Sequence, residues 1–151
     1  MKRHDSLAPV SRQHHSGLLT ARLLQADAPA YKGMPTTPAG KRDYAVNFLE
    51  EHLRPHFRLE EETVFILARQ VSEELRKQAD QLEAEHRQLE QLILTLPEAS
   101  EIILPEKLHE TGKLLEQHIR TEERIFFELL QQEVPEEKLQ VLQQQVRQHL
   151  H

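Results

Sequence analysis

Four long segments of this chain carry a core-forming residue at every third or fourth position, the spacing of one face of an α-helix. In each segment at least one histidine occupies a position of this stripe, where the pattern calls for a buried residue. A fold for this chain must therefore bring four histidines into its interior. The stripes consist of Leu7, Val10, His14, Gly17, Ala21 and Leu24; of Ala45, Leu49, His52, His56, Leu59, Glu60, Thr63 and Leu67; of Leu75, Ala79, Leu82, His86, Leu89, Ile93 and Leu96; and of Leu108, Thr111, Leu115, His118, Glu122, Ile125 and Leu129.

Proline and glycine divide the chain into these helices and a short fifth one. Thr37 before Pro38 predicts a helix start, and Ser72 can cap the next helix. Pro55 predicts a kink or a local bulge directly before His56. The expected helices span about residues 6–27, 38–70, 72–96, 100 or 105–132, and 135–149. Short connections favour an all-α, up-down-up-down four-helix bundle with a short extra C-terminal helix.

Composition agrees with this class and excludes several functions. The chain has 151 residues, enough for one domain, with only four glycines and 5% aromatic residues. A formal charge of −6 argues against nucleic acid or an anionic membrane as the partner. No apolar run approaches the roughly 20 residues that span a bilayer, and no secretory signal is present, so we expect a soluble cytoplasmic protein. Without cysteine, any metal must be bound by nitrogen and oxygen.

The positions of the four histidines along the helices predict that they meet at one level. Two residues on neighbouring antiparallel helices face each other when they lie equally far from the turn between them. The midpoint of His56 and His86 is residue 71, that of His86 and His118 is 102, and that of His14 and His56 is 35, each at an expected turn. Each histidine is thus roughly 22 Å from its turn, at 1.5 Å per residue.

Four imidazoles in an apolar core need polar partners, because each unsatisfied group costs on the order of 1–3 kcal/mol. Glu60 follows His56 and Glu122 follows His118 by four residues, which places each pair on one helix face. Imidazole nitrogens and carboxylate oxygens together suit iron or manganese. Six ligands exceed one tetrahedral shell, so the residues predict two metal ions that share the carboxylates.

Several neighbouring residues keep two interpretations. On the first helix the apolar direction favours His14 over His15. Glu90 is either an extra ligand or the exposed flank of its helix, and His52 is either a donor behind His56 or, preferably, a packed histidine. Gly17 marks either a close helix contact or room for a small ligand beside His14. The remaining histidines, His4, His109, His149 and His151, are expected at the surface.

The segments HFRLEEETVF and HIRTEERIFF resemble the two His-xxx-Glu segments of hemerythrin-like, or HHE cation-binding, proteins, and SRQHHSGLL and AEHRQLEQL are similar to the other two histidine-bearing helices of that family. The resemblance implies that residues 1–151 form one such domain with a di-iron centre. It assigns one iron to His14 and His56 and the other to His86 and His118, with Glu60 and Glu122 bridging. It also implies an open iron position for oxygen or nitric oxide. Glu90 stands where the oxygen carriers have a further histidine, which should favour ferric iron.

Two other functions compete with this interpretation. A ferritin-like carboxylate oxidase would use Glu-xx-His pairs, which occur as Glu83 with His86 and Glu106 with His109. A non-catalytic helical interaction module would use the glutamine-rich last helix as its partner surface. Together with the residues, the resemblance favours a di-iron protein that binds oxygen, nitric oxide or iron itself for sensing, storage or stress protection. They do not specify an enzymatic activity.

Overall fold

The computed structural model describes residues 2–151, and no strand occurs within them, so the predicted all-α class is confirmed. The first helix, α1, spans Ala8–Leu23 and ends earlier than the expected Asp27. The helix ends here because the next backbone N–H groups bond to other acceptors than the carbonyl four residues earlier. The N–H of Gln25 bonds back to Arg22 in a tighter turn, and the N–H of Ala26 donates to the His109 ring at 2.9 Å.

The second predicted helix is a continuous helical segment of five parts. The side chain of Thr37 accepts the N–H of Gly40 at 3.1 Å, as expected of an N-cap. A wide π-helical turn lies directly before Pro55, which confirms the predicted local bulge. A second π-helical turn begins at Glu60 and was not predicted. The parts are α2 (Pro38–Phe48), η1 (Leu49–Leu53), α3 (Arg54–Leu59), η2 (Glu60–Val64) and α4 (Phe65–Val71).

The second half of the chain, from Ser72 onward, also contains a capped helix start and a π-helical turn. Ser72 caps the next helix by accepting the N–H of Leu75 at 3.1 Å. A third π-helical turn begins at Glu122 and, like the second, was not predicted. The parts are α5 (Glu73–Thr95), η3 (Leu96–Glu98), α6 (Leu104–Thr121), η4 (Glu122–Phe126), α7 (Phe127–Glu133) and α8 (Glu136–Leu150).

Because of the π-helical turns, some residues that were predicted to be buried lie at or near the surface. Each one holds an extra residue, and because one residue turns an α-helix by about 100°, the face that points inward changes after it. Ile125, expected inside, is 54% exposed, and Leu67 and Leu129 are only partly buried. Phe126 and Phe127 are fully buried instead. The stripe of α5, which has no such turn, is buried as predicted.

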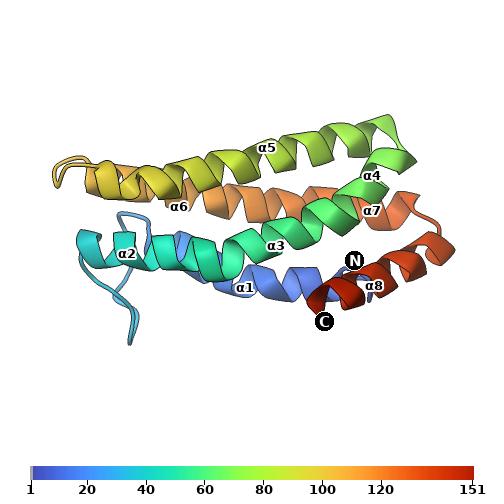
Figure 1. Ribbon diagram of the computed structural model, residues 1–151, viewed down its shortest axis with the longest axis horizontal. Helices are drawn as coiled ribbons and strands as arrows, with labels where there is room; N and C mark the ends of the chain where they lie inside the picture. Colours follow the sequence, from blue (N-terminus) through green and yellow to red (C-terminus); the bar gives the residue numbers. More distant parts are fainter. Residues whose placement is uncertain (1) are drawn as a thin grey trace.

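The long helical segments lie side by side along the longest axis of the molecule (Figure 1). Among them, α1 packs on α6, α4 on α5, and α5 on α6. Two apolar clusters form the interior, one containing Val10, Leu82 and Phe126, the other containing Ala21 and Leu89. The predicted histidine of each helix falls between members of these two clusters along the sequence, so the clusters flank the histidine level from both sides.

The last helix, α8, covers the first of these clusters. Its residues Leu139, Leu142 and Val146 are buried there within the same chain, and α8 packs on α3 and η2 (Figure 1). Among residues 2–151, no helix has both the length and the apolar character that a membrane crossing requires.

Candidate metal centre

The structure buries all four predicted histidines and brings their rings together. His14 lies on α1, His56 on α3, His86 on α5 and His118 on α6, with exposed fractions of 3, 7, 0 and 2%. The His14 and His56 ring centroids are 4.8 Å apart, and those of His86 and His118 are 4.9 Å apart. The level expected from the midpoints is therefore present in the fold.

Glu60, the first residue of η2, is fully buried and faces three of these rings. Its Oε1 lies 3.3 Å from Nε2 of His56 and 3.2 Å from Nε2 of His86. Its Oε2 lies 3.8 Å from Nε2 of His14. One carboxylate thus reaches both histidine pairs.

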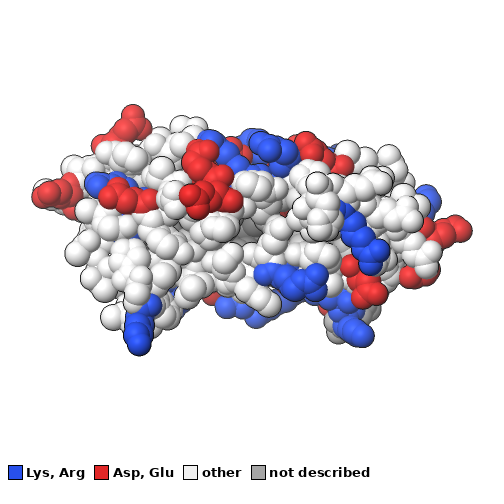
Figure 2. Space-filling model, turned by 60° about the horizontal axis from the view of Figure 1, so that its bottom comes forward, with Lys and Arg blue, Asp and Glu red and all other residues white. Residues whose placement is uncertain are grey.

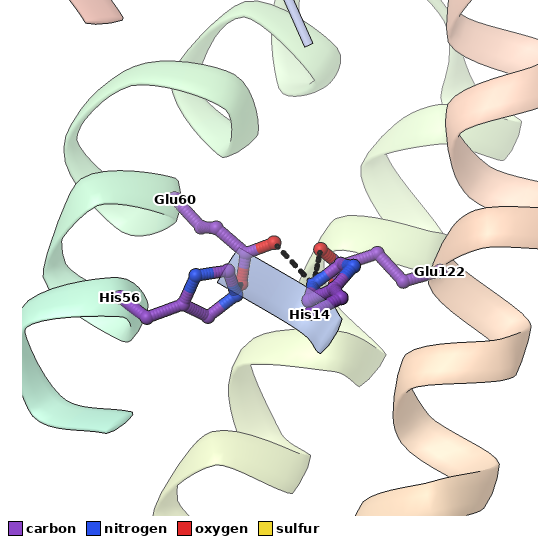
Figure 3. Close-up of side chains that lie close together, drawn as sticks. All are labelled: His14, His56, Glu60 and Glu122. Atoms are coloured by element: carbon purple, nitrogen blue, oxygen red, sulfur yellow. Dashed lines mark ion pairs between the residues drawn. The ribbon is translucent and has the colours of Figure 1, made fainter. Parts of the chain in front are cut away.

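Glu122, the first residue of η4, is also fully buried and has a similar position on the other side. Its Oε1 is 3.3 Å from Nε2 of His14, and its Oε2 is 3.4 Å from Nε2 of His118. In Figure 3 the carboxylates of Glu60 and Glu122 both point toward the His14 ring. The six residues form two groups with ligand-type atoms within 4.8 Å of one another, and both groups contain the two glutamates: His14, His56, Glu60 and Glu122, and Glu60, His86, His118 and Glu122.

The facing atoms lack hydrogen-bond partners within the chain. Among the described residues, nine buried side-chain nitrogen or oxygen atoms have no partner, and seven of them belong to this cluster. Leaving so many polar atoms buried and unpaired is costly unless another group satisfies them. A cation that accepts nitrogen and oxygen lone pairs fits this donor set. The seven atoms are Nε2 of His14, His86 and His118 and both oxygens of Glu60 and Glu122.

Electrostatics holds three of the six groups, Glu60, His56 and His118, in the forms that bind cations, whereas, despite burial, hydrogen bonds to carboxylates raise the pKa of His14 and of His86. Burial raises the pKa of Glu60, but the surrounding imidazoles outweigh it and hold that pKa well below its ordinary value. Burial lowers the pKa of His56 and of His118, which keeps both rings neutral. Burial also lowers the pKa of His14, but contacts with Glu123 and Glu60 prevail and raise it to about 9. In the absence of a cation, a proton on His14 compensates part of the negative charge.

Each histidine also uses its second ring nitrogen, Nδ1, and sequence reasoning did not find these partners. The Nδ1 atoms of the four rings bond to Glu123, Gln13, Glu61 and Glu85, and each of these partners comes directly before or after one of the six cluster residues in the sequence. A residue beside an inward-facing one can point sideways to the neighbouring helix, but this adjacency is shared with many solvated residues and does not identify the partners by itself. Such bonds fix the ring orientation and tautomer that a metal ligand needs. The distances are 2.5 Å for His14 with Glu123, 2.7 Å for His56 with Gln13, 2.7 Å for His86 with Glu61 and 2.6 Å for His118 with Glu85.

Other candidates from the sequence lie outside the cluster. Glu90 pairs with Arg87 at 3.1 Å and Arg54 at 3.5 Å, so it is the flank of its helix and not a member of either group. His15 is exposed, as the preference for His14 requires. The preferred packed position for His52 was wrong, because its ring is exposed and lies against Phe48, one turn earlier.

The residues of the ferritin-like alternative are likewise dispersed. Glu83 pairs with Arg69 at 3.5 Å, and His109 accepts the N–H of Ala26. Neither residue belongs to the two groups of potential ligands.

A cavity of about 160 Å³ adjoins the cluster, and both interpretations of Gly17 apply there. Gly17 lines the cavity, and a Cβ on it would lie 2.8 Å from the Cδ1 atom of Ile119. Three of the four site histidines also line this cavity, and His86 does not. Figure 2 shows that one face of the molecule is hollowed near its middle, with acidic and basic side chains interspersed around the hollow.

Comparison with known proteins identifies the family. The family model described as the hemerythrin HHE cation binding domain matches residues 8–130, a range that contains all six cluster residues. No curated protein and no solved structure gives a significant match.

Proposed function

Because this chain belongs to the hemerythrin HHE cation-binding domain family, we propose that it is a non-haem di-iron protein with an up-down-up-down four-helix bundle as its scaffold. Its ligand is oxygen, nitric oxide or iron itself, and its role is sensing, storage or stress protection in the cytoplasm. The acidic net charge, −6, favours a small ligand over nucleic acid.

One observation carries this proposal: seven buried nitrogen and oxygen atoms that have no hydrogen-bond partner within residues 2–151 face one another at the centre of the fold. His14 and His56 would bind one iron, and His86 and His118 the other. Glu60 and Glu122 belong to both groups of potential ligands and would serve both ions. When bound, iron would supply a redox couple and an open position for a diatomic molecule.

The chain itself would orient the histidine rings and keep the carboxylates buried. The bonds at Nδ1 leave each Nε2 free to face inward, and burial keeps water away from the carboxylates. The cavity beside His14 and His56 gives a small molecule a path to this side of the cluster.

Anaerobic loading with Fe²⁺ followed by elemental analysis tests the proposal, and two iron atoms per chain are expected. Glu60→Gln should lower this number, since the amide removes a charge shared by both groups. Glu90→Gln is the matched control and should retain two, because Glu90 forms ion pairs with Arg54 and Arg87 outside the cluster. Binding of a single ion, or of none, by the native chain would contradict the proposal. Exposure of the reduced protein to air or nitric oxide, followed by optical spectroscopy, then distinguishes the ligands.

A further inference from the structure

The bonds at the four Nδ1 atoms form a closed ring around the cluster. Gln13 of α1 bonds to the histidine of α3, and Glu61 of η2 to that of α5. Glu85 of α5 bonds to the histidine of α6, and Glu123 of η4 to that of α1. Each helical segment therefore supplies the outer partner for the next segment's histidine. Three of the four partners are carboxylates, and Gln13 alone is a neutral amide.

This difference divides the ring into unequal halves. The pair His86 and His118 has two carboxylate partners, whereas the pair His14 and His56 has one carboxylate and the amide. A carboxylate that accepts the Nδ1 hydrogen makes the imidazole a stronger donor to a cation, and its charge attracts the cation directly. The amide does neither to the same degree.

Arginines near the carboxylates do not remove the difference. Glu61 pairs with Arg87, and Glu123 pairs with Arg3 at 3.3 Å, so each half has one carboxylate that an arginine screens. Glu85 bonds to Gln81, and among residues 2–151 no lysine or arginine forms an ion pair with it. The half with His86 and His118 therefore keeps one more unscreened negative charge.

Exposure differs in the same direction. His56, whose partner is Gln13, is the most exposed of the four histidines at 7%, whereas His86 is completely buried. Gln13 itself lines the cavity of about 160 Å³, together with His14 and His56. His118 also lines this cavity, but His86 does not, so the half with His14 and His56 is the one in which both histidines and an outer partner adjoin it.

From these observations we propose that the two iron positions are unequal, with a tight position at His86 and His118 and an exchangeable position at His14 and His56 that the neutral side chain of Gln13 weakens. This inference rests on the proposed di-iron function. Gln13 is then a positioning residue that sets how readily the iron at His14 and His56 dissociates. Glu85 has the corresponding role for the iron at His86 and His118, which it helps to retain.

The test uses the full chain loaded with Fe²⁺ under anaerobic conditions and equilibrated against rising concentrations of a chelator of known affinity. Bound iron per chain is the measured quantity. The native protein should release one iron well before the other. Gln13→Glu should strengthen the weaker step by about 10–100-fold and leave the tighter step nearly unchanged, since changes of such outer partners typically alter metal affinity by this factor. Glu85→Gln should weaken the tighter step by a similar factor.

Glu83→Gln is the matched control, because Glu83 lies two residues from Glu85 on α5 but pairs with Arg69 at the surface. It should change neither step. The gain in affinity expected from Gln13→Glu separates a tuning role from simple damage, which could only lower affinity. Simultaneous release of both ions in all four proteins, or a response of the tighter step to Gln13→Glu, would overturn this inference while leaving the di-iron function intact. A chain that never binds two ions would overturn the function itself.

Discussion

Gly112 lies where α6 packs tightly against α1. A Cβ at this position would be 2.5 Å from the carbonyl oxygen of Ala21, a backbone atom that the helix holds in place. The equivalent atom at Gly17 would instead meet the end of the Ile119 side chain, which can turn into the adjoining cavity. The two glycines therefore tolerate substitution differently.

We expect Gly112→Ala to reduce the free energy of unfolding by roughly 1–3 kcal/mol, the usual cost of overpacking. Gly17→Ala should stay within about 1 kcal/mol of the native protein, because alanine gains about 1 kcal/mol in helix propensity. Urea unfolding of the metal-free proteins measures both. Equal losses would show that the α1–α6 contact does not depend on Gly112.

The inner ligand set was accessible to sequence reasoning because His14, His56, His86 and His118 share a period and a level. Their outer partners were not, because a glutamine or glutamate beside an inward position has the same local pattern as a solvated residue. Gln13 and Glu85 acquire their roles only when a neighbouring helix is placed next to them. The sequence left two interpretations of Glu90 open for the same reason, since one of its arginine partners, Arg54, comes from a neighbouring helical segment and only Arg87 from its own helix.

At the scale of helices, the π-helical turns at Glu60 and Glu122 follow the two His-xxx-Glu pairs directly. A period of 3.5 residues, continued through such a turn, places Ile125 and Leu129 inside, and this was wrong. The wider hydrogen-bond spacing of a π-helical turn has no signature in the amino-acid composition. The sequence therefore predicted the buried face of α5 well, but not that of the helices after η2 and η4. Pro55 was the exception, because a missing N–H is a visible cause of a bulge.

Because η4 contains one extra residue, we expect that one residue can be deleted from this turn without disrupting the packing of the helix. Removing the exposed Arg124 from this turn gives a regular helix in which Phe126 and Leu130 take the third and seventh positions after Glu122, still on the inner face. We expect this variant to fold cooperatively, as followed by thermal melting in circular dichroism.

Deletion of Lys113, also exposed but within the regular part of α6, is the matched control. It rotates every later residue by about 100° relative to the preceding ones and should abolish cooperative folding. If both deletions abolish folding, the extra residue of η4 is required by the core itself.

The helix α8 should contribute to stability through one face only. Leu142 is 1% exposed within an apolar cluster, whereas its neighbour Val141 is 54% exposed. We expect Leu142→Ala to cost about 2–5 kcal/mol of unfolding free energy and Val141→Ala less than about 0.5 kcal/mol. Chemical denaturation distinguishes them, and similar small effects would indicate that α8 is not part of the folded core.

For the molecule as a whole, removal of iron should lower the melting temperature. The ions would bind only the folded chain, and a ligand at 100 times its dissociation constant stabilises the folded state by about 2.7 kcal/mol. For a chain of this length this corresponds to a decrease of about 5–10 °C on removal of the metal. Calorimetry with and without iron measures it, with Glu60→Gln as the variant whose two melting temperatures should differ less. Identical melting of the native protein in both states would contradict a buried centre.

The contact of Arg3 with η4 has a practical consequence for producing this protein. Arg3 donates to the backbone oxygen of Glu123 at 2.9 Å and pairs with its carboxylate, and that carboxylate accepts from His14. A purification tag fused directly before Met1 would lie close to Arg3. Arg3 is linked through Glu123 to His14 of the cluster. His151, at the other end, is exposed. Recombinant versions should therefore carry their tags after His151, so that comparisons of iron content report on the protein and not on the fusion.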